Sequence, residues 1–431
     1  MDTMDLAYLC GFGSYWESEA LPNALPKGQN SPKKNAYGLY TEQLSGSAFT
    51  RLRHENLRTW LYRILPSVLQ EDFTAYKGIE SFHHNASYAP PPNQMRWDPL
   101  PIPDKPLDFI HSLQHVLYNG DPCGHLGGAA IYVFCATTSM QDTYFYNADG
   151  ELLIVPYLGA MRIRTELGIL EIVPGEILCV PRGVKFCAEV LGSVAAGYVC
   201  ENWGAPFSLP YLGPIGSNGL ANPRDFKIPM ANYEDKSGEC LLICKYLNNF
   251  WQASLSHSPL NVVAWHGNYS PYKYDLRLFN TINTVSFDHP DPSIFTVLTS
   301  PTSTPGLANV DFVIFPERWM VAEHTFRPPY YHRNIMSEYM GLIYGVYDAK
   351  SSDFKPGGGS LHNCMSAHGP DKETFLKAQQ DSESPYKITD TLACMFESSK
   401  PWIPTPWANH TPLRQKNYVH CWQNLPKLFN K

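Results

Sequence analysis

The hydrophobic pattern between residues 129 and 201 is that of short β-strands separated by tight turns. Glycines at positions 150, 159, 168, 175, 183 and 192 punctuate it at intervals of 9, 9, 7, 8 and 9 residues. The runs between them alternate or are continuously apolar, and they are Leu152–Val155, Met161–Thr165, Leu170–Val173 and Ile177–Gly183. Strands at this spacing are typical of a β-sandwich or barrel.

A second β-rich block begins near residue 282. Its apolar runs are Phe295–Leu298, Phe312–Phe315 and Met340–Tyr347, with prolines at 290, 292, 301, 305 and 316 between them. The two blocks predict a mainly β chain of cupin-like jelly-roll or β-sandwich architecture, with two β domains. We place the boundary so that residues 1–280 form an N-terminal domain and residues 281–431 a C-terminal one. In the first domain an irregular segment would wrap a β-sandwich whose clearest part is 129–201.

Two segments have helical periodicity instead. Phe109, Leu113, Val116 and Leu117 fall on one helical face and predict a helix over Leu107–Tyr118. A second helix is predicted over Lys372–Ser382, before a proline-rich tail that should pack across another unit.

Charge and composition narrow the functional classes. The 431 residues include 33 Lys+Arg and 40 Asp+Glu, a net charge of −7, so no basic surface points to nucleic acid. Only 17% of residues are charged, against a usual ~25%, which favours an oligomer. No apolar stretch approaches the ~18 residues of a membrane span and no secretory signal is recognisable, so neither membrane nor export is expected. The eleven cysteines lack closely spaced pairs, which predicts free thiols in a reducing cytoplasm.

The placement of histidines directs attention to the second block. None of the fifteen lies between residues 126 and 256, whereas seven lie between 257 and 368. The first β block therefore has no histidine to offer a metal, and the histidines around His332 and His368 in the C-terminal domain are the metal candidate. His332 and Glu338 are six residues apart, so a regular strand would place both on one face, whereas a helix would separate them by about 240°. His368 follows a glycine run, Gly357–Gly359, that suggests a flexible or close-packed crossing.

Two imidazoles and one carboxylate on one face of a metal leave positions open, as in non-haem Fe(II) oxygenases. Zinc is less favoured because no cysteine pair is suitably placed. The alternative without metal is that His332 is a core histidine, Glu338 pairs with Arg333, and His368 caps a turn.

Other polar residues near these positions could take part in chemistry. His289 lies in the stiff sequence FDHPDP, where Asp288 and Asp291 could orient it as an acid or base. Tyr330 lies two residues before His332, and a phenol near a metal can bind a ligand oxygen. Tyr347 is nine residues from Glu338, which places it on the opposite face of an ideal strand unless Gly345 marks a bulge.

Long stretches of the sequence resemble the homogentisate 1,2-dioxygenases. They are YTEQLSGSAFT (40–50), WLYRILPS (60–67), GPIGSNGLANPRDF (213–226), NVVAWHGNYSPYKY (261–274), FDHPDPSIFTVLT (287–299), FRPPYYHRNIMSEYMGLI (326–343) and PGGGSLHNCMSAHGPD (356–371). The resemblance implies a cytoplasmic enzyme of tyrosine and phenylalanine catabolism that opens the ring of homogentisate with O2 to give 4-maleylacetoacetate. It also implies one Fe(II) per subunit and a homohexamer built from two trimers.

The resemblance assigns roles to individual residues. His332, Glu338 and His368 would bind the iron, and His289 would be the active-site acid or base. Tyr347 and His368 would contact the substrate, with Tyr330 and His362 as further pocket residues. A related dioxygenase acting on gentisate or another hydroquinone acid, and a two-domain cupin that binds without catalysis, remain as alternatives.

Overall fold

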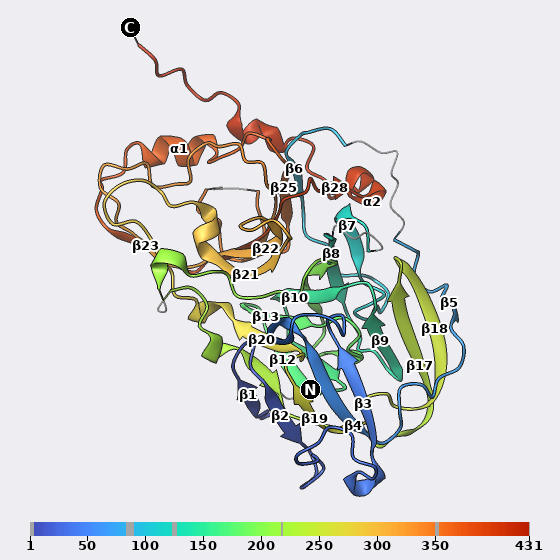
Figure 1. Cartoon of the computed structure of the whole chain (residues 1–431). Coiled ribbons are helices and arrows are strands. Elements are labelled where there is room, and N and C mark those ends of the chain that lie inside the picture. The colour runs from blue at the N-terminus through green and yellow to red at the C-terminus, as the bar shows by residue number, and fades with distance from the viewer. Residues whose placement is uncertain (1–3, 83–89, 123–126, 217–218, 350–352, 431) are drawn as a thin grey trace.

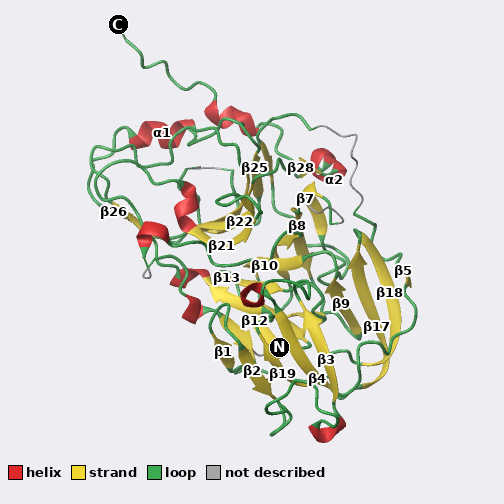
Figure 2. Cartoon of the chain, in the orientation of Figure 1, coloured by secondary structure: helices red, strands yellow, loops and turns green. Residues whose placement is uncertain are grey.

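Strands dominate the structure, a computed structural model that describes residues 4–82, 90–122, 127–216, 219–349 and 353–430. Strand accounts for 39% and helix for 8%, so the prediction of a mainly β chain is confirmed. The described residues form five sheets, and the strands and short helices are distributed over the two β-rich blocks (Figures 1 and 2). None of the described helices is long and apolar enough to cross a bilayer.

Three sheets belong mainly to the first block. The largest runs β1 (Tyr8–Cys10), β16 (Lys227–Pro229), β20 (Tyr272–Asp275), β13 (Glu176–Val180), β10 (Glu151–Leu158), β15 (Ala195–Asn202), β8 (Gly128–Ala136), β7 (Gln114–Gly120) and β28 (Ile403–Pro404). The second runs β12 (Gly168–Ile172), β11 (Met161–Thr165), β14 (Phe186–Val190), β9 (Thr143–Asn147), β17 (Ser237–Tyr246), β18 (Asn249–His257) and β5 (Thr74–Ala75). The third runs β2 (Trp16–Glu19), β19 (Val262–Gly267), β4 (Arg58–Arg63) and β3 (Tyr40–Ser45). The four strands expected between 152 and 183 are therefore present as β10 to β13.

The C-terminal block is built on one further sheet. Its order is β21 (Thr296–Pro301), β22 (Ala308–Phe315), β27 (Leu392–Ser398), β24 (Ser337–Tyr344), β25 (Gly359–His362) and β6 (Met95–Trp97), and a two-stranded sheet joins β23 (Arg318–Met320) to β26 (Tyr386–Ile388). The edge strand β6 comes from the N-terminal part of the chain and lies beside β25 (Figure 1). The two blocks thus exchange strands, because β28 in turn joins β7 of the first block.

The helices are short and lie at the periphery. The α-helices are α1 (Lys372–Ala378) and α2 (Pro406–His410), and the 3-10 helices are η1 (Ala36–Gly38), η2 (Arg53–Glu55), η3 (Gly213–Ile215), η4 (Pro223–Asp225), η5 (Leu276–Leu278), η6 (Pro292–Phe295) and η7 (Tyr418–Trp422). α1 confirms the helix predicted from Lys372. It begins where the Asp371 carboxylate accepts a hydrogen bond from the Thr374 backbone N–H at 2.8 Å.

The helix predicted over Leu107–Tyr118 is wrong. One turn forms, in which the Ser112 N–H donates to the Asp108 carbonyl and the Asp108 carboxylate accepts from the His111 N–H. The chain then becomes strand β7, which pairs with β8 over Gly120↔Gly128 to Gln114↔Val133. Pairing with a fully buried strand outweighs the weak local preference for helix.

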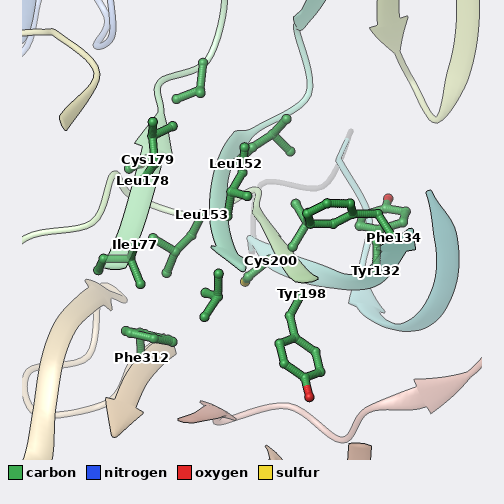
Figure 3. Packing of buried hydrophobic residues seen from close by; sticks show 14 of the residues in the cluster. Tyr132, Phe134, Leu152, Leu153, Ile177, Leu178, Cys179, Tyr198, Cys200 and Phe312 are labelled. Carbon is green, nitrogen blue, oxygen red and sulfur yellow. The ribbon is translucent and has the colours of Figure 1, made fainter. Parts of the chain in front are cut away.

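One continuous hydrophobic core joins the two blocks. Figure 3 shows part of it, with Ile177 of β13 from the first block and Phe312 of β22 from the second as members of the same cluster. Tyr198 of β15 extends from the first block, and its hydroxyl donates to the carbonyls of Leu342 (3.1 Å) and Gly358 (2.7 Å). A first-block strand therefore anchors the middle of the glycine run.

The glycine run is close-packed. Gly357 has φ +85°, and a Cβ there would overlap the Tyr157 ring, while a Cβ on Gly359 would overlap Tyr339. Side chains larger than hydrogen are excluded at both positions, at Gly357 also by backbone conformation. This packing determines where β25 begins.

The division of the chain at residue 280 stays a prediction.

Glu151 is a buried acid in the first block. Its carboxylate accepts hydrogen bonds from the Asn202 amide and the Phe207 N–H, and Cys179 Sγ lies 3.7 Å from its other oxygen. Burial outweighs these contacts and raises the pKa of Glu151 to about 7. A carboxyl whose pKa is higher in the folded than in the unfolded chain favours folding at low pH, so this stabilisation is lost as pH rises from the unfolded pKa to about 7.

We therefore expect Glu151→Gln to be more stable than the wild type at pH 8 and close to it at pH 4.5. The amide oxygen can accept the same two N–H groups without carrying a buried charge. At about 1.4 kcal/mol per pKa unit the difference should reach about 3 kcal/mol. Urea unfolding at both pH values measures it, and an equal effect at both would contradict the explanation.

Candidate metal centre

A backbone bridge brings the two predicted histidine ligands together. The His332 N–H donates to the His368 carbonyl at 2.9 Å, and the His368 N–H donates to the His332 carbonyl at 3.1 Å. The expectation that His332 and Glu338 share one regular strand is wrong, because β24 begins only at Ser337 and a bend precedes it. Glu338 points to the same site from the second position of β24.

The side chains of these three residues converge. His368 Nε2 lies 2.9 Å from Glu338 Oε2, and His332 Nε2 lies 3.8 Å from Glu338 Oε1. One donor atom from each residue lies within 4.8 Å of those of the other two, a grouping able to hold a metal ion. The ion pairs of Glu338 in the described chain are with His332, His362 and His368 rather than Arg333.

The hydrogen bonds of the two imidazoles fit metal ligation. His332 Nδ1 lies 2.8 Å from the Tyr330 carbonyl, and His368 Nδ1 lies 2.9 Å from the Ser366 carbonyl. A carbonyl only accepts, so each Nδ1 carries a proton, and the neutral ring presents an Nε2 lone pair towards Glu338. Lone pairs on nitrogen and carboxylate oxygen repel each other unless a proton or cation lies between them. The donor set therefore requires a positive charge at its centre.

The charge distribution agrees with this requirement. Burial alone would raise the pKa of Glu338, but hydrogen bonds from His332, His362 and His368 hold it well below its usual value. The hydrogen bond to Glu338 raises the pKa of His332. The carboxylate is thus ionised, and in the absence of metal it favours a proton on the imidazole of His332.

A row of ionisable side chains extends from Glu338 across the sheet. The register places Asp311, Glu397, Glu338 and His362 directly opposite one another on β22, β27, β24 and β25. Burial, followed by the charge of Glu338, raises the pKa of Glu397 to about 8. Glu397 also accepts from the Asn334 amide at 3.2 Å, which ties the row to the segment after His332.

His362 packs against the metal-binding residues. Its ring stacks on His368 with centroids 4.1 Å apart, and its Nδ1 lies 3.9 Å from Glu338 Oε2. Its Nε2 lies 2.7 Å from the Tyr418 hydroxyl. His362 is thus in contact with two members of the donor set.

A small cavity, partly open to solvent, leads to the donor atoms. The described residues that line it are Phe315, Pro329, His332, Glu338, Met340, Tyr347, Ala349, Phe354, Ser360, His362, His368, Gly369 and Met395. Its walls are mainly apolar, as is typical of small-molecule sites.

Tyr347 reaches this cavity although strand parity places it on the far face. A register shift between Leu342 and Tyr344 and a positive φ of +80° at Gly345 interrupt the alternation. Tyr347 is 7% exposed and packs on Phe315. Burial raises its pKa well above the usual value, so the phenol stays protonated and able to donate.

His289 and Tyr330 are outside the described lining of the cavity. His289 is buried, and its Nδ1 contacts the Pro290 carbonyl at 2.7 Å, so neither Asp288 nor Asp291 provides this hydrogen bond. Burial lowers the pKa of His289. Asp291 instead accepts from the Tyr330 hydroxyl at 2.5 Å, which connects the His289 loop to the segment carrying His332.

Sequence reasoning missed Glu397, Asn334 and Tyr418. Glu397 and Tyr418 lie 59 and 80 residues beyond Glu338, and no local spacing relates them to it. One signal in the sequence was usable for Glu397. It directly follows the apolar run Leu392–Phe396, which could have indicated a buried carboxyl group at the end of a strand.

Two histidines and one carboxylate on a β-scaffold define the class of non-haem metal site that leaves coordination positions open. The comparison with protein families agrees. The model described as "Homogentisate 1,2-dioxygenase N-terminal" matches residues 7–276, and the one described as "Homogentisate 1,2-dioxygenase C-terminal" matches residues 277–429. The chain belongs to the homogentisate 1,2-dioxygenase family, which implies a dioxygenase with a metal cofactor.

Solved structures show more distant likeness. Protein Ylba from E. coli is 10% identical, with 73% of this chain and 95% of that chain covered and a TM-score of 0.30. A cupin 2 conserved barrel domain protein from Leptotrichia buccalis is also 10% identical, with 67% and 88% covered and a TM-score of 0.29. Neither bears on function.

Replacing His332, Glu338 or His368 singly with Ala should weaken binding of a divalent metal about 100-fold or more, because each supplies one of three protein donors. Metal content after loading with Co(II) or anaerobic Fe(II) measures this, and circular dichroism checks the fold. His324→Ala is the matched control, since this side chain is 78% exposed. A triad variant that retained stoichiometric metal would exclude that residue as a ligand.

Proposed function

We propose that the chain is an Fe(II)-dependent ring-cleaving dioxygenase that converts homogentisate and O2 to 4-maleylacetoacetate in tyrosine and phenylalanine catabolism. One Fe(II) per subunit is held by His332, Glu338 and His368. The observation that carries the proposal is the convergence of these three donors at the end of a cavity, in a chain of this family.

Iron(II) in such a site supplies open positions at which a substrate oxygen and O2 can bind side by side. The protein supplies placement and a dry surrounding. Phe315, Met340, Phe354 and Met395 form apolar walls that exclude water from an aromatic ring. Tyr347 donates a hydrogen bond to the substrate, which its protonated state supports.

His289 moves the proton of a ring hydroxyl. A phenol with a pKa of ~10 is neutral at pH 7 and must lose its proton to bind a metal well. An imidazole whose pKa is lowered by burial is neutral at that pH and can accept it. The bond from Tyr330 to Asp291 supports a fixed placement of this loop relative to His332.

His368, His362 and Tyr330 have further roles at the metal ligands. His368 also contacts the substrate, and His362 holds His368 and Glu338 in place through the stack and the 3.9 Å contact. The Tyr330 carbonyl fixes the ring of His332. The phenol of the same residue, which is 44% exposed as a whole, contacts Asp291.

The assembly and location follow from surface and thiol chemistry. We propose a homohexamer of two trimers, supported by the low charged fraction and by exposed large side chains such as Phe287, Trp319 and Ile335. A cytoplasmic location is supported by the ten described cysteines, all free, of which seven are buried.

Substrate identity is tested by anaerobic loading with Fe(II), followed by O2 uptake and product absorbance with homogentisate and gentisate in parallel. We expect one O2 consumed per homogentisate, dependent on iron, and none with gentisate. O2 uptake with gentisate but not with homogentisate would make gentisate the substrate. Bound iron without O2 uptake on either compound would favour a protein that binds without catalysis.

His289→Phe should keep its iron but lower kcat about 100-fold or more, because the general base is lost while the metal ligands remain. Because burial lowers the pKa of His289, the wild-type rate should hold between pH 8 and 7 and fall only as pH decreases below about 6.5, and the variant should lose this dependence. His324→Phe, at an exposed position, serves as the control. An unchanged kcat in His289→Phe would reduce His289 to a loop residue.

A further inference from the structure

A groove that is open to solvent lies where the two β-rich blocks meet. It is lined by the segment around η3 from the first block and by η6, β21 and the start of β22 from the second. Its walls are mainly apolar: Leu212 and Ile215 come from the first block, and Ile294 and Leu307 from the second. An apolar groove of this kind can accept an extended segment of chain.

Backbone hydrogen bonds fix the two blocks relative to each other at this groove. The N–H and carbonyl groups of Ser208 bond those of Thr299, at 2.8 Å in both directions, and Leu220 pairs with Asn280 in the same way. The groove is therefore preformed, which reduces the ordering cost of filling it.

The groove is negatively charged. Asp291 and Asp311 are the charged residues of its described lining, which contains no lysine, arginine or histidine. Burial raises the pKa of Asp311 to about 6, so this carboxyl is mainly ionised at about pH 7.5. The groove thus favours an occupant that combines apolar side chains with positive charge.

One segment of the chain has this composition and lacks contacts of its own. Residues 424–430, with the sequence NLPKLFN, contain Lys427 and no acidic residue. They make no hydrogen bond or ion pair with the other described residues, and they run away from the body of the molecule beyond η7 (Figure 1). Leu428 is 53% exposed and Phe429 is 66% exposed. Two neighbouring large apolar side chains on a projecting segment indicate a binding element.

We propose that residues 424–430 of one copy of this chain bind in the groove of a second copy, with Leu428 and Phe429 against its apolar walls and Lys427 beside Asp291 and Asp311. The segment projects from its own chain, so the groove that it reaches is that of a neighbour. A contact between two different surfaces of identical chains closes into a ring when the rotation permits. The proposal therefore rests on the proposed hexamer of two trimers and names a contact within each trimer.

This contact would link assembly to the metal site. Pro290 and Asp291 line the groove and directly follow His289, the proposed general base. The segment of a neighbouring copy would therefore pack against the loop that carries this residue. Each active site would then depend on a second chain for the support of one of its walls.

The test replaces Phe429 of the full-length, metal-free protein with p-benzoylphenylalanine, which forms a covalent bond to nearby groups on irradiation. We expect a product of twice the chain mass, and mass spectrometry of its peptides should place the link in residues 210–220 or 290–311. Phe49, which is 83% exposed, is the matched control position, and the same probe there should give no link to these ranges.

Charge and apolar variants of the segment sharpen the test. Lys427→Glu should lower the yield of the link about fivefold or more, because it places a third negative charge beside two carboxylates, whereas Lys427→Arg should keep the yield. Leu428→Ser should lower it about threefold or more through lost apolar contact. None of these changes should unfold the chain, since the segment makes no hydrogen bond or ion pair within it.

The oligomeric state separates the possible failures. Sedimentation of the unirradiated protein as a monomer would overturn both the hexamer and this contact. An oligomer in which the probe at position 429 links to its own chain, to another surface or to nothing would overturn the contact alone, as would an unchanged yield in Lys427→Glu and Leu428→Ser. Neither measurement needs iron or turnover, so both are independent of the proposed reaction.

Discussion

An ionised carboxylate buried among imidazole nitrogens is stable only when a positive charge lies beside it, and the C-terminal sheet is arranged around this constraint. Glu338 is 4% exposed and directed at His332 and His368, whose other nitrogens are already committed to carbonyl groups. Protons or a cation must complete the group. A metal ion satisfies all three residues at once, which is why their geometry indicates a metal centre more strongly than their spacing does.

The scaffold holds these residues by backbone contacts rather than by a long strand. The reciprocal hydrogen bonds between His332 and His368 join two segments 36 residues apart. The first block contributes as well, since Tyr198 binds the carbonyls of Leu342 and Gly358 and so positions β24 and the glycine run. The first block thus helps to define the site, because a tyrosine of its strand β15 is buried against the C-terminal sheet.

The local environment gives neighbouring ionisable groups of this chain different pKa values, and therefore different charges. Glu338 has a lowered pKa among imidazoles, whereas Glu397, its cross-strand neighbour, has one raised to about 8. Adjacent carboxyl groups on one sheet face cannot both be charged cheaply, so one remains ionised for the metal and the other protonated.

The sequence by itself determined the mainly β character and the candidate metal ligands. Period-two apolar runs and regularly spaced glycines predict strands directly, and the absence of histidine from residues 126–256 removes the first β block from the candidates for metal ligation. Tertiary structure decided the rest. Leu107–Tyr118 became a turn and a strand because β8 offered a pairing partner, and Tyr347 reached the cavity because the alternation breaks before it. Glu397 and Tyr418 came to lie beside the centre through strand register and chain crossing, which act between residues too distant in sequence for any local pattern to relate them.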